Sequence, residues 1–369
     1  MRTSKRLAGL VLALGLVTAA CGGSGGSTGE TSTAPTDPAT DAVTDAETDA
    51  ANPAVEPDAE GPLTIYSGRS EELVGEVFTR FTAATGIEVE VRYAGTSELA
   101  ATILEEGGNS PADVYWAQDA GALGALARAG SLATLADDVL DLVEPQFRSP
   151  DGHWIGVTGR VRTVVWNKDN LTEAALPASV FDLTDAGWEG RVGWAPTNGS
   201  FQSFVTAMRR LHGDDATRQW VRDMLGNSVH EYPNNTSIVD AVGRGEIDLG
   251  MVNHYYLLRF LAEDPEFPAA NLFLAEDVGG LVNVAGVGIV ASTDQPAAAD
   301  QLVRFLLADD IQNWFGSFTD ELEYPLAVGQ PSPPGLPSLA SLHPPVIDLS
   351  DLDDLEGTLA LLREEGALS

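Results

Sequence analysis

The chain has 369 residues and a large excess of acidic side chains, with 55 Asp and Glu against 20 Lys and Arg and a formal net charge of -35. A surface of this sign repels the phosphate backbone, so we exclude nucleic acid as a partner. The single cysteine excludes an intrachain disulfide and a metal site built from several thiolates.

The N-terminus carries the pattern of a signal peptide over residues 1–20. A basic start is followed by an apolar run over 7–20, which is too short to span a bilayer. Cys21 follows directly, and this junction resembles the acylation site of bacterial lipoproteins. An ordinary signal peptide with a chance cysteine is the alternative. We expect lipidation at Cys21, because several acyl chains on one residue give a stable membrane anchor.

The segment 21–61 predicts a linker. Residues 22–61 contain no Lys, Arg or aromatic side chain and are rich in Gly, Ser, Thr, Pro, Ala and acid. Such a composition cannot bury enough apolar surface to offset the entropy of the chain. We therefore expect a lipid-anchored protein whose folded body begins at residue 62 and works outside the cytoplasm.

The first part of the body alternates strand and helix patterns. Apolar residues at Leu73, Val77 and Phe81 have helical spacing, and Gly86 is suited to end that helix. A β-α-β-α-β order predicts a parallel sheet with helices on both faces. The expected strands are 63–66, 87–93 and 113–116, and the expected helices are 71–84, 97–106 and 121–129.

A second set of strands and helices follows, with a strand that returns to the first set. Its expected strands are 192–194, 247–252 and 286–291, and its expected helices are 201–211, 238–244 and 297–307. We assign residues 62–162 and 286–333 to a first lobe, and 163–285 and 334–369 to a second lobe. Small ligands bind preferentially between domains, so we expect a hinge and a cleft between the lobes.

Two adjacent tyrosines, Tyr255 and Tyr256, follow the apolar strand 247–252, where we expect the chain to turn. Ligands bind outside the carboxyl ends of strands in open α/β sheets. Paired phenolates are hard oxygen ligands that suit a small, highly charged ion such as Fe(III). Two half-buried aromatics with hydroxyls at the surface are the alternative.

A second candidate site opens the predicted helix 201–211. Asn198, Gly199 and Ser200 precede this helix, and the free N–H groups and dipole of a helix start attract anions. Asn and Ser are also favoured as plain N-caps, so both roles can hold together.

Seven segments stand out by their order and spacing. They are YSGRSEELV at 66–74, GNSPADVYWAQDAGAL at 108–123, GVTGRVRTVVWN at 156–167, WEGRVGWAPTNGSFQSFV at 188–205, YPNNTSIVDAV at 232–242, VNHYYL at 252–257 and EYPL at 323–326. Together they resemble the periplasmic iron-binding proteins of bacterial ABC importers. The resemblance implies a two-lobed type II periplasmic-binding-protein fold of the α/β class, holding Fe(III) with carbonate or phosphate in the interlobe cleft.

The resemblance also implies roles for individual residues. Tyr255 and Tyr256 match the paired phenolate ligands, and the turn at Asn198, Gly199 and Ser200 matches the anion-binding turn. Two further residues, Asn235 and Asn253, match side chains that hold the anion in some members, although either amide could instead serve a turn.

The chain departs from the family at other ligand positions. Ser70 stands where some members have histidine, Gln118 where some have glutamate, and Phe201 where others have tyrosine. Asp119 is the nearest carboxylate that could replace a ligand, although it also suits a helix N-cap. We expect Gln118 to lie near the anion.

Three arginines, Arg69, Arg160 and Arg162, are candidates for ion pairs. Arg69 could neutralise the bound anion or form a surface ion pair. Arg160 and Arg162 lie near the expected hinge, where salt bridges are their default role.

We expect a monomeric transport protein that delivers Fe(III) to an ABC permease. An enzyme is not expected, since the five histidines form no H-E-x-x-H or paired metal motif. Two alternatives stay open: a binding protein for an organic solute or oxyanion, such as a phosphonate or polyamine, on the same fold, and a lipoprotein that presents a ligand to a receptor.

Overall fold

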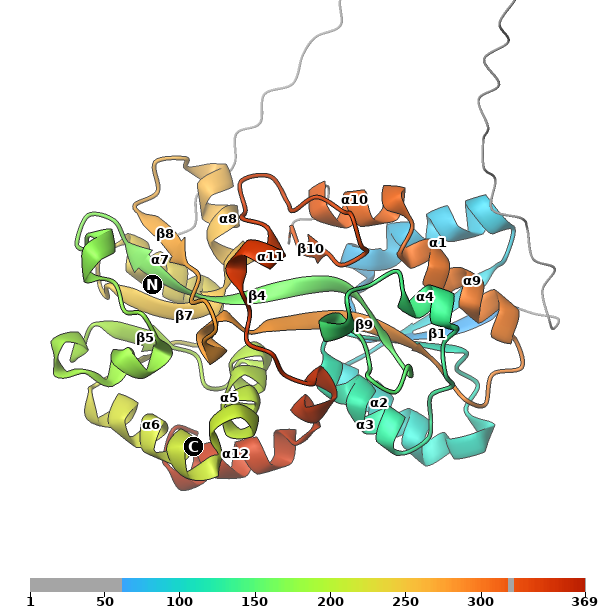
Figure 1. Ribbon diagram of the computed structural model, residues 1–369, viewed down its shortest axis with the longest axis horizontal. Coiled ribbons are helices and arrows are strands. Elements are labelled where there is room, and N and C mark those ends of the chain that lie inside the picture. Colours follow the sequence, from blue (N-terminus) through green and yellow to red (C-terminus); the bar gives the residue numbers. More distant parts are fainter. Residues whose placement is uncertain (1–61, 318–321, 369) are drawn as a thin grey trace, which may run out of the picture. The chain divides into compact units, whose positions relative to one another are not determined.

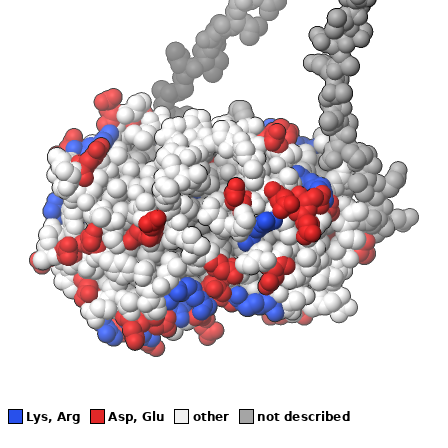
Figure 2. All heavy atoms as spheres, in the orientation of Figure 1, with Lys and Arg blue, Asp and Glu red and all other residues white. Residues whose placement is uncertain are grey.

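The computed structural model describes residues 62–317 and 322–368. The predicted signal peptide, the lipidation site Cys21 and the whole predicted linker lie outside these residues. No helix within the described ranges is long and apolar enough to cross a membrane. Acidic side chains are spread over the face shown in Figure 2, with basic side chains between them.

The first lobe contains a sheet in the order β2-β1-β3-β9-β4. The pairs β1–β2 and β1–β3 are parallel, as predicted, but β9 lies antiparallel between β3 and β4. The predicted parallel arrangement of the first three strands is therefore confirmed, and the returning strand joins them in the opposite direction. The strands are β1 Leu63–Ser67, β2 Val89–Tyr93, β3 Val114–Ala117, β9 Val282–Ile289, β4 Ile155–Asn167 and β10 Tyr324–Pro325.

Helices of the first lobe follow the predicted patterns with small shifts at their ends. Val74, Val77 and Phe81 lie on the buried face of α1, and Gly86 ends the helix with a φ of 77°, a left-handed conformation that glycine adopts without strain. The main helices are α1 Glu71–Thr85, α2 Thr96–Glu106, α3 Ala120–Arg128, α9 Pro296–Leu306 and α10 Asp309–Ser317. A short helix, α4, covers Asp137–Leu140.

The second lobe continues the sheet in the order β4-β7-β5-β6. The pairs β5–β6 and β5–β7 are parallel, whereas β4 runs antiparallel to β7 and β8. Its strands are β5 Val192–Trp194, β6 His230–Glu231, β7 Leu249–Asn253 and β8 Ala269–Leu272. Its helices are α5 Gly199–His212, α6 Asp214–Gly226, α7 Asn235–Gly243, α8 His254–Glu263 and α12 Leu355–Glu364.

The long strand β4 passes through both lobes and is buried along its whole length (Figure 1). It pairs with β9 as far as Val161 and with β7 from Arg162 onward. The same strand therefore has first-lobe partners up to Val161 and second-lobe partners from Arg162 onward. The returning strand β9 begins at Val282, earlier than the predicted 286.

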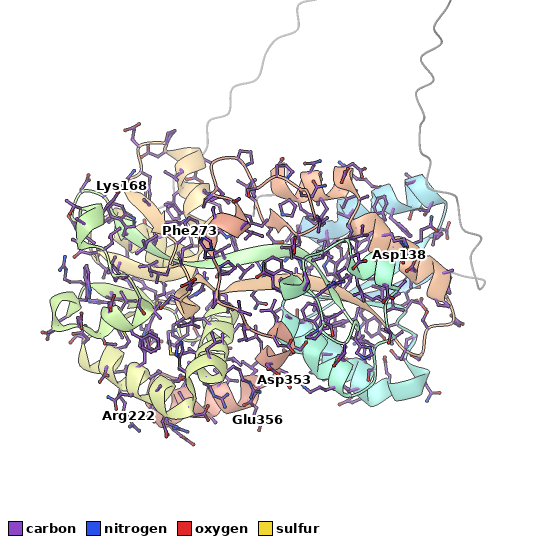
Figure 3. All side chains as sticks on the ribbon, in the orientation of Figure 1. Asp138, Lys168, Arg222, Phe273, Asp353 and Glu356 are labelled. Carbon is purple, nitrogen blue, oxygen red and sulfur yellow. The ribbon has the colours of Figure 1, made fainter. Side chains whose placement is uncertain are left out.

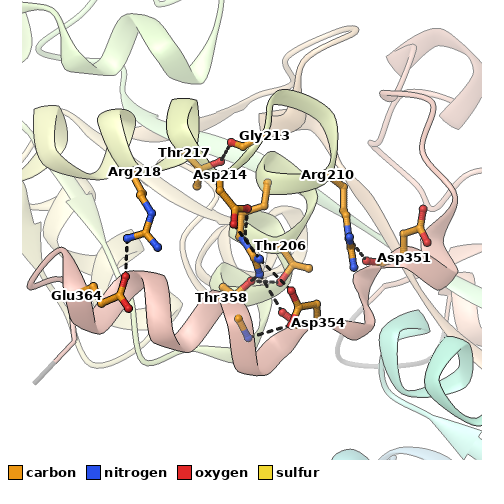
Figure 4. A network of polar contacts seen from close by, with 12 residues as sticks. Thr206, Arg210, Gly213, Asp214, Thr217, Arg218, Asp351, Asp354, Thr358 and Glu364 are labelled. Atoms are coloured by element: carbon orange, nitrogen blue, oxygen red, sulfur yellow. Dashed lines mark hydrogen bonds and ion pairs between the residues drawn. The ribbon is translucent and has the colours of Figure 1, made fainter.

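The C-terminal segment contacts both lobes. Its 3₁₀ turn Leu349–Asp353 packs on α3, where Gly121 and Gly124 lie so close to its backbone that a Cβ atom would collide with it. The following helix α12 lies against α5 and α6, with a 2.7 Å contact between the hydroxyls of Thr206 and Thr358 (Figure 4). The short helix α11 covers Leu339–Leu342.

Candidate functional site

A cavity of about 880 Å³ lies between the lobes. Helices α2 and α3 line it from the first lobe, and the first turns of α5 and α8 line it from the second lobe. Asp353 and Glu356 of the C-terminal segment lie at its border and are labelled in Figure 3. The predicted cleft therefore has walls from both lobes and from the segment that joins them.

Tyr255 and Tyr256 both line this cavity. Tyr255 is buried and Tyr256 is half-buried, and their ring centroids are 4.4 Å apart with the planes tilted by 31°. The predicted strand end is confirmed, since β7 ends at Asn253, and the chain turns there directly into α8, which begins at His254. Apolar residues at helical spacing beyond the pair continue the helix. The tyrosines thus lie in the first helical turn, where the backbone fixes them side by side.

A cation accompanies the tyrosine pair on its own helix. The guanidinium of Arg259 lies 5.4 Å from the ring centroid of Tyr255 and 5.3 Å from that of Tyr256. A guanidinium over an aromatic face is attracted to the ring electrons. The side chain of Arg259 therefore places a positive charge beside both phenols.

Arg162 connects the tyrosines with the predicted anion turn. Its Nη1 donates to Ser200 Oγ at 3.1 Å and to Asn253 Oδ1 at 3.2 Å, and its Nη2 donates to the Met251 carbonyl at 3.2 Å. Burial lowers the pKa of Arg162 to about 10, and the nearby tyrosines act in the opposite direction. The default salt bridge predicted for Arg162 is not what the structure has, since these partners are neutral oxygens.

The predicted anion turn caps α5. Asn198 is the N-cap, and its Oδ1 accepts from the Ser200 N–H at 3.0 Å and from the Ser200 hydroxyl at 2.6 Å. All three turn residues line the cavity, and a Cβ at Gly199 would meet nothing within 4 Å. The turn therefore acts as an N-cap and also presents the start of a helix to the cavity.

The two predicted asparagines occupy different places. Asn253 lines the cavity beside Arg162. Asn235 lies outside the cavity lining, and its amide donates to Asn198 Oδ1 at 3.3 Å and Ser200 Oγ at 3.4 Å. Asn235 is thus placed to support the anion turn from behind. We call Tyr255, Tyr256, Asn198, Gly199, Ser200, Asn253 and Arg162 together the tyrosine wall.

On the other side, Gln118, Asp119, Arg160 and Asn283 form what we call the opposite wall. Asp119 is the N-cap of α3 and accepts from the Ala122 N–H at 3.3 Å. Burial raises the pKa of Asp119, while Arg160 and the helix N–H groups oppose that shift. The carboxylate of Asp119 faces the cavity but already has partners of its own.

The structure places Arg69 away from the cavity. Its guanidinium forms a bidentate ion pair with Glu323, at 2.9 Å and 3.0 Å, and both side chains are 1% exposed. Arg160 lies 3.6 Å from the same carboxylate, so its predicted salt bridge is confirmed. Burial alone would raise the pKa of Glu323, but Arg69 and Arg160 hold it below its usual range. The expected contact of Arg69 with an anion is therefore not supported. The arginine instead forms a buried ion pair inside the first lobe.

Sequence reasoning missed three groups of this site. The sequence pattern assigns Arg162 only a hinge salt bridge and gives Arg259 no role, and Asn283 lies in β9 before the predicted start of that strand. The spacing of Arg259, four residues after Tyr255, would have been a signal if the helix had been recognised. Within the described residues there is no cluster of three or more His, Cys, Asp or Glu side chains suited to a metal ion.

Comparison with known proteins places the chain in a family. A family model described as bacterial extracellular solute-binding protein matches residues 76–320. The Fe(3+)-binding periplasmic protein of Serratia marcescens is 32% identical over 314 residues, which cover 84% of this chain and 92% of that protein.

Solved structures agree with the sequence relatives. Iron-bound HitA from Pseudomonas aeruginosa has a TM-score of 0.74 at 35% identity, covering 83% of this chain and 99% of that chain. A Trichodesmium protein, IdiA (FutA), in complex with iron and citrate ligands, has a TM-score of 0.71 at 26% identity with the same coverage. The predicted two-lobed type II fold is confirmed. The chain belongs to the bacterial extracellular solute-binding proteins, and these relatives are its iron-binding members.

Proposed function

We propose that this protein captures Fe(III) in the cavity through Tyr255 and Tyr256 and delivers it to an ABC permease. The observation that carries the proposal is the phenol pair on the cavity wall, with ring centroids 4.4 Å apart and flanked by Arg162 and Arg259. Phenolate oxygens are hard ligands suited to a hard trivalent ion. Both arginines place positive charge near the phenols, where it would offset the negative charge of two iron-bound phenolates.

A small oxyanion, carbonate or phosphate, completes the proposed site. The N-terminus of α5 at Gly199 and Ser200 supplies N–H groups and a dipole of the right sign. Arg162 adds a buried positive charge beside Ser200 and Asn253. Asn198 Oδ1 and the tyrosines are the nearby oxygens that an anion would have to avoid. A bridging anion would supply iron ligands that the two tyrosines do not.

Asp119 and Gln118 have supporting roles in this proposal. Asp119 faces the cavity as a further candidate ligand, and Gln118 is a candidate to contact the anion from the opposite wall. Closure of the lobes around β4 and β9 would bring this wall over the ion. A permease that recognises the closed form would then select the loaded protein.

We also propose where in the cell the protein acts. Lipidation at Cys21 would hold the protein on the outer side of the cytoplasmic membrane, with 22–61 as a tether and the body acting as a monomer. A transport role fits the family, whose members bind solutes. We expect no catalytic activity.

One spectrum tests the proposal. Purified protein titrated with ferric citrate should develop a visible phenolate-to-iron charge-transfer band that saturates at one iron per chain. The alternative, an organic solute or oxyanion such as a phosphonate or polyamine, remains relevant because about 880 Å³ is within the range of organic ligand pockets. Tight binding of such a solute without any band on adding iron would favour that alternative and reject the iron proposal.

A further inference from the structure

The residue before the tyrosine pair, His254, is fully buried and uses both ring nitrogens. Its Nδ1 accepts from the Val161 N–H at 3.2 Å, and its Nε2 lies 3.2 Å from the Leu322 carbonyl, to which it can only donate. These two bonds define one neutral tautomer. They also tie the first turn of α8, in the second lobe, to two segments outside that lobe.

The bond to Val161 lies where β4 changes its partners. On the edge of β4 that faces away from β9, β10 pairs at Thr158 and Gly159, and β7 pairs only from Arg162 onward. Between them, the N–H of Val161 is taken by the imidazole of His254. A buried N–H needs a partner, and here a side chain supplies what a strand does not. His254 thus contacts β4 at the junction between its first-lobe and second-lobe partners.

The bond to Leu322 reaches a fixed part of the first lobe. Leu322 has a φ of 42°, a left-handed conformation that costs energy for a residue other than glycine. The next residue, Glu323, is held by its buried pair with Arg69 and by the hydroxyl of Thr158. This anchoring keeps the Leu322 carbonyl directed at His254.

Ring contacts extend the same link to the ligands. The imidazole centroid lies 5.5 Å from the ring of Tyr255, edge to face, and 5.1 Å from the ring of Tyr324 in β10. A continuous set of contacts therefore runs from the first lobe through His254 to the tyrosine pair. We propose that His254 is a positioning residue, which holds the tyrosines in their binding geometry only while the two lobes keep the relative orientation seen in this structure.

This inference rests on the proposed function, because it assumes that the tyrosines ligate iron. It predicts in addition that movement of the lobes changes the geometry of the tyrosine pair. A rotation of the lobes displaces Leu322 relative to α8, and His254 transmits that displacement to the first turn of the helix. Opening would then loosen the phenolates at the same moment as it exposes the iron.

Two substitutions separate the two bonds. His254→Asn keeps a polar atom near the position of Nδ1 but cannot reach Leu322, whereas His254→Gln places an amide donor near the position of Nε2. We expect iron release to a competing chelator to become roughly tenfold faster in the Asn variant, the effect of one lost buried hydrogen bond. Its charge-transfer band should shift in wavelength. The Gln variant should recover most of the slow release.

A control removes a buried hydrogen bond elsewhere in the second lobe. Thr217 is fully buried in α6 and donates to the Gly213 carbonyl at 2.9 Å, and it does not line the cavity. Thr217→Val should lower stability but leave the band and the release rate unchanged. A structural role for His254 without positioning would make the Asn variant behave like this control, and that result would overturn the inference.

A variant in the other lobe covers the case in which His254→Asn does not fold. Leu322→Gly relieves the left-handed strain and frees the carbonyl, so release should accelerate by about threefold while His254 is intact. Wild-type band and release rate in this variant would overturn the inference. The proposed function fails separately: wild-type protein would then show no band at all, and the inference would fall with it.

Discussion

The two walls of the cavity are built on different principles. The tyrosine wall takes its groups from the first turns of α5 and α8 and from Arg162, whose partners are neutral oxygens. In the opposite wall the charged groups have charged or capping partners: Arg160 lies beside Glu323, and Asp119 caps α3. One wall has positive charge and phenols to offer a ligand, whereas the other is largely satisfied by the protein itself.

This difference suggests a division of work between the lobes. A wall with a buried arginine whose partners are neutral oxygens attracts an anion, so it can bind on its own. A wall whose charges are already paired gains little from binding and serves mainly to close over the ligand. We therefore expect substitutions in the tyrosine wall to change iron affinity, and substitutions behind the opposite wall to change stability.

The largest effect should come from Tyr255 and Tyr256 together. Replacing both with Phe removes only two hydroxyls, and we expect the charge-transfer band and specific iron binding to disappear while the fold is kept. Circular dichroism and an iron titration measure the two parts. Tyr232→Phe is the matched control, since Tyr232 does not line the cavity. Unchanged iron affinity in the double variant would contradict the role of this wall.

The opposite behaviour is expected at Glu323. Glu323→Gln removes the buried negative charge that Arg69 and Arg160 share, which should cost about 3–5 kcal/mol in the free energy of unfolding. Iron affinity of the folded protein should change far less. Denaturant titration gives the first quantity and a chelator competition the second.

The matched control for this substitution is Glu76→Gln. The ion pair of Glu76 with Arg80 is exposed, so its loss should change the free energy of unfolding by less than about 0.5 kcal/mol. A loss of iron affinity in Glu323→Gln larger than its loss of stability would show that the ion pair behind the opposite wall acts in binding.

Acidification should separate binding from folding. Each phenol releases a proton when it ligates iron, so affinity falls as pH falls, on the order of a hundredfold per pH unit when both phenols bind. The pKa of Glu323 is lowered in the folded state, so its contribution to stability is complete above the ordinary glutamate range and is lost only as pH falls toward the lower folded value.

We therefore expect iron to leave in mildly acidic solution, before the protein unfolds. A competitive iron titration followed over pH, with circular dichroism on the same samples, measures both processes. Affinity that does not depend on pH in this range would exclude phenolate ligation. Coincident iron loss and unfolding would mean that release is a consequence of unfolding.

The two walls also differ in how far the sequence predicted them. The predicted end of a strand located Tyr255 and Tyr256, and the predicted start of a helix located the turn at Asn198, because local patterns mark the ends of such elements. The sheet order and the ion pair of Arg69 with Glu323, 254 positions apart in the chain, depend on long-range pairing that no local pattern contains. For the same reason the role of Arg162 was missed: its neighbours become visible only when β4 and β7 are aligned.

The anion turn offers a smaller effect within the tyrosine wall. A side chain at Gly199 points into open space, so Gly199→Leu should be accepted by the fold but obstruct the approach of an anion. We expect iron affinity to fall by about tenfold in carbonate or phosphate buffer, the value of a lost charge-assisted hydrogen bond, and by less in buffer without these anions. Gly226→Leu on α6, also in open space, is the control. Equal losses in both buffers would make the turn purely structural.

The smallest effect is expected at Asp119, which tests whether the opposite wall contributes an iron ligand. Asp119→Asn keeps an N-cap of similar quality for α3, so stability should change little, and it removes the negative charge. Because the carboxylate already accepts from the Ala122 N–H and lies near Arg160, we expect iron affinity to change by less than about threefold, the size of a weak, partly screened charge effect. Asp119→Ala should instead cost about 1 kcal/mol of stability through the lost cap. Chelator competition on both variants decides between the roles. A loss of two orders of magnitude in the Asn variant would make Asp119 a ligand, and the first lobe would then share in holding the ion as well as closing over it.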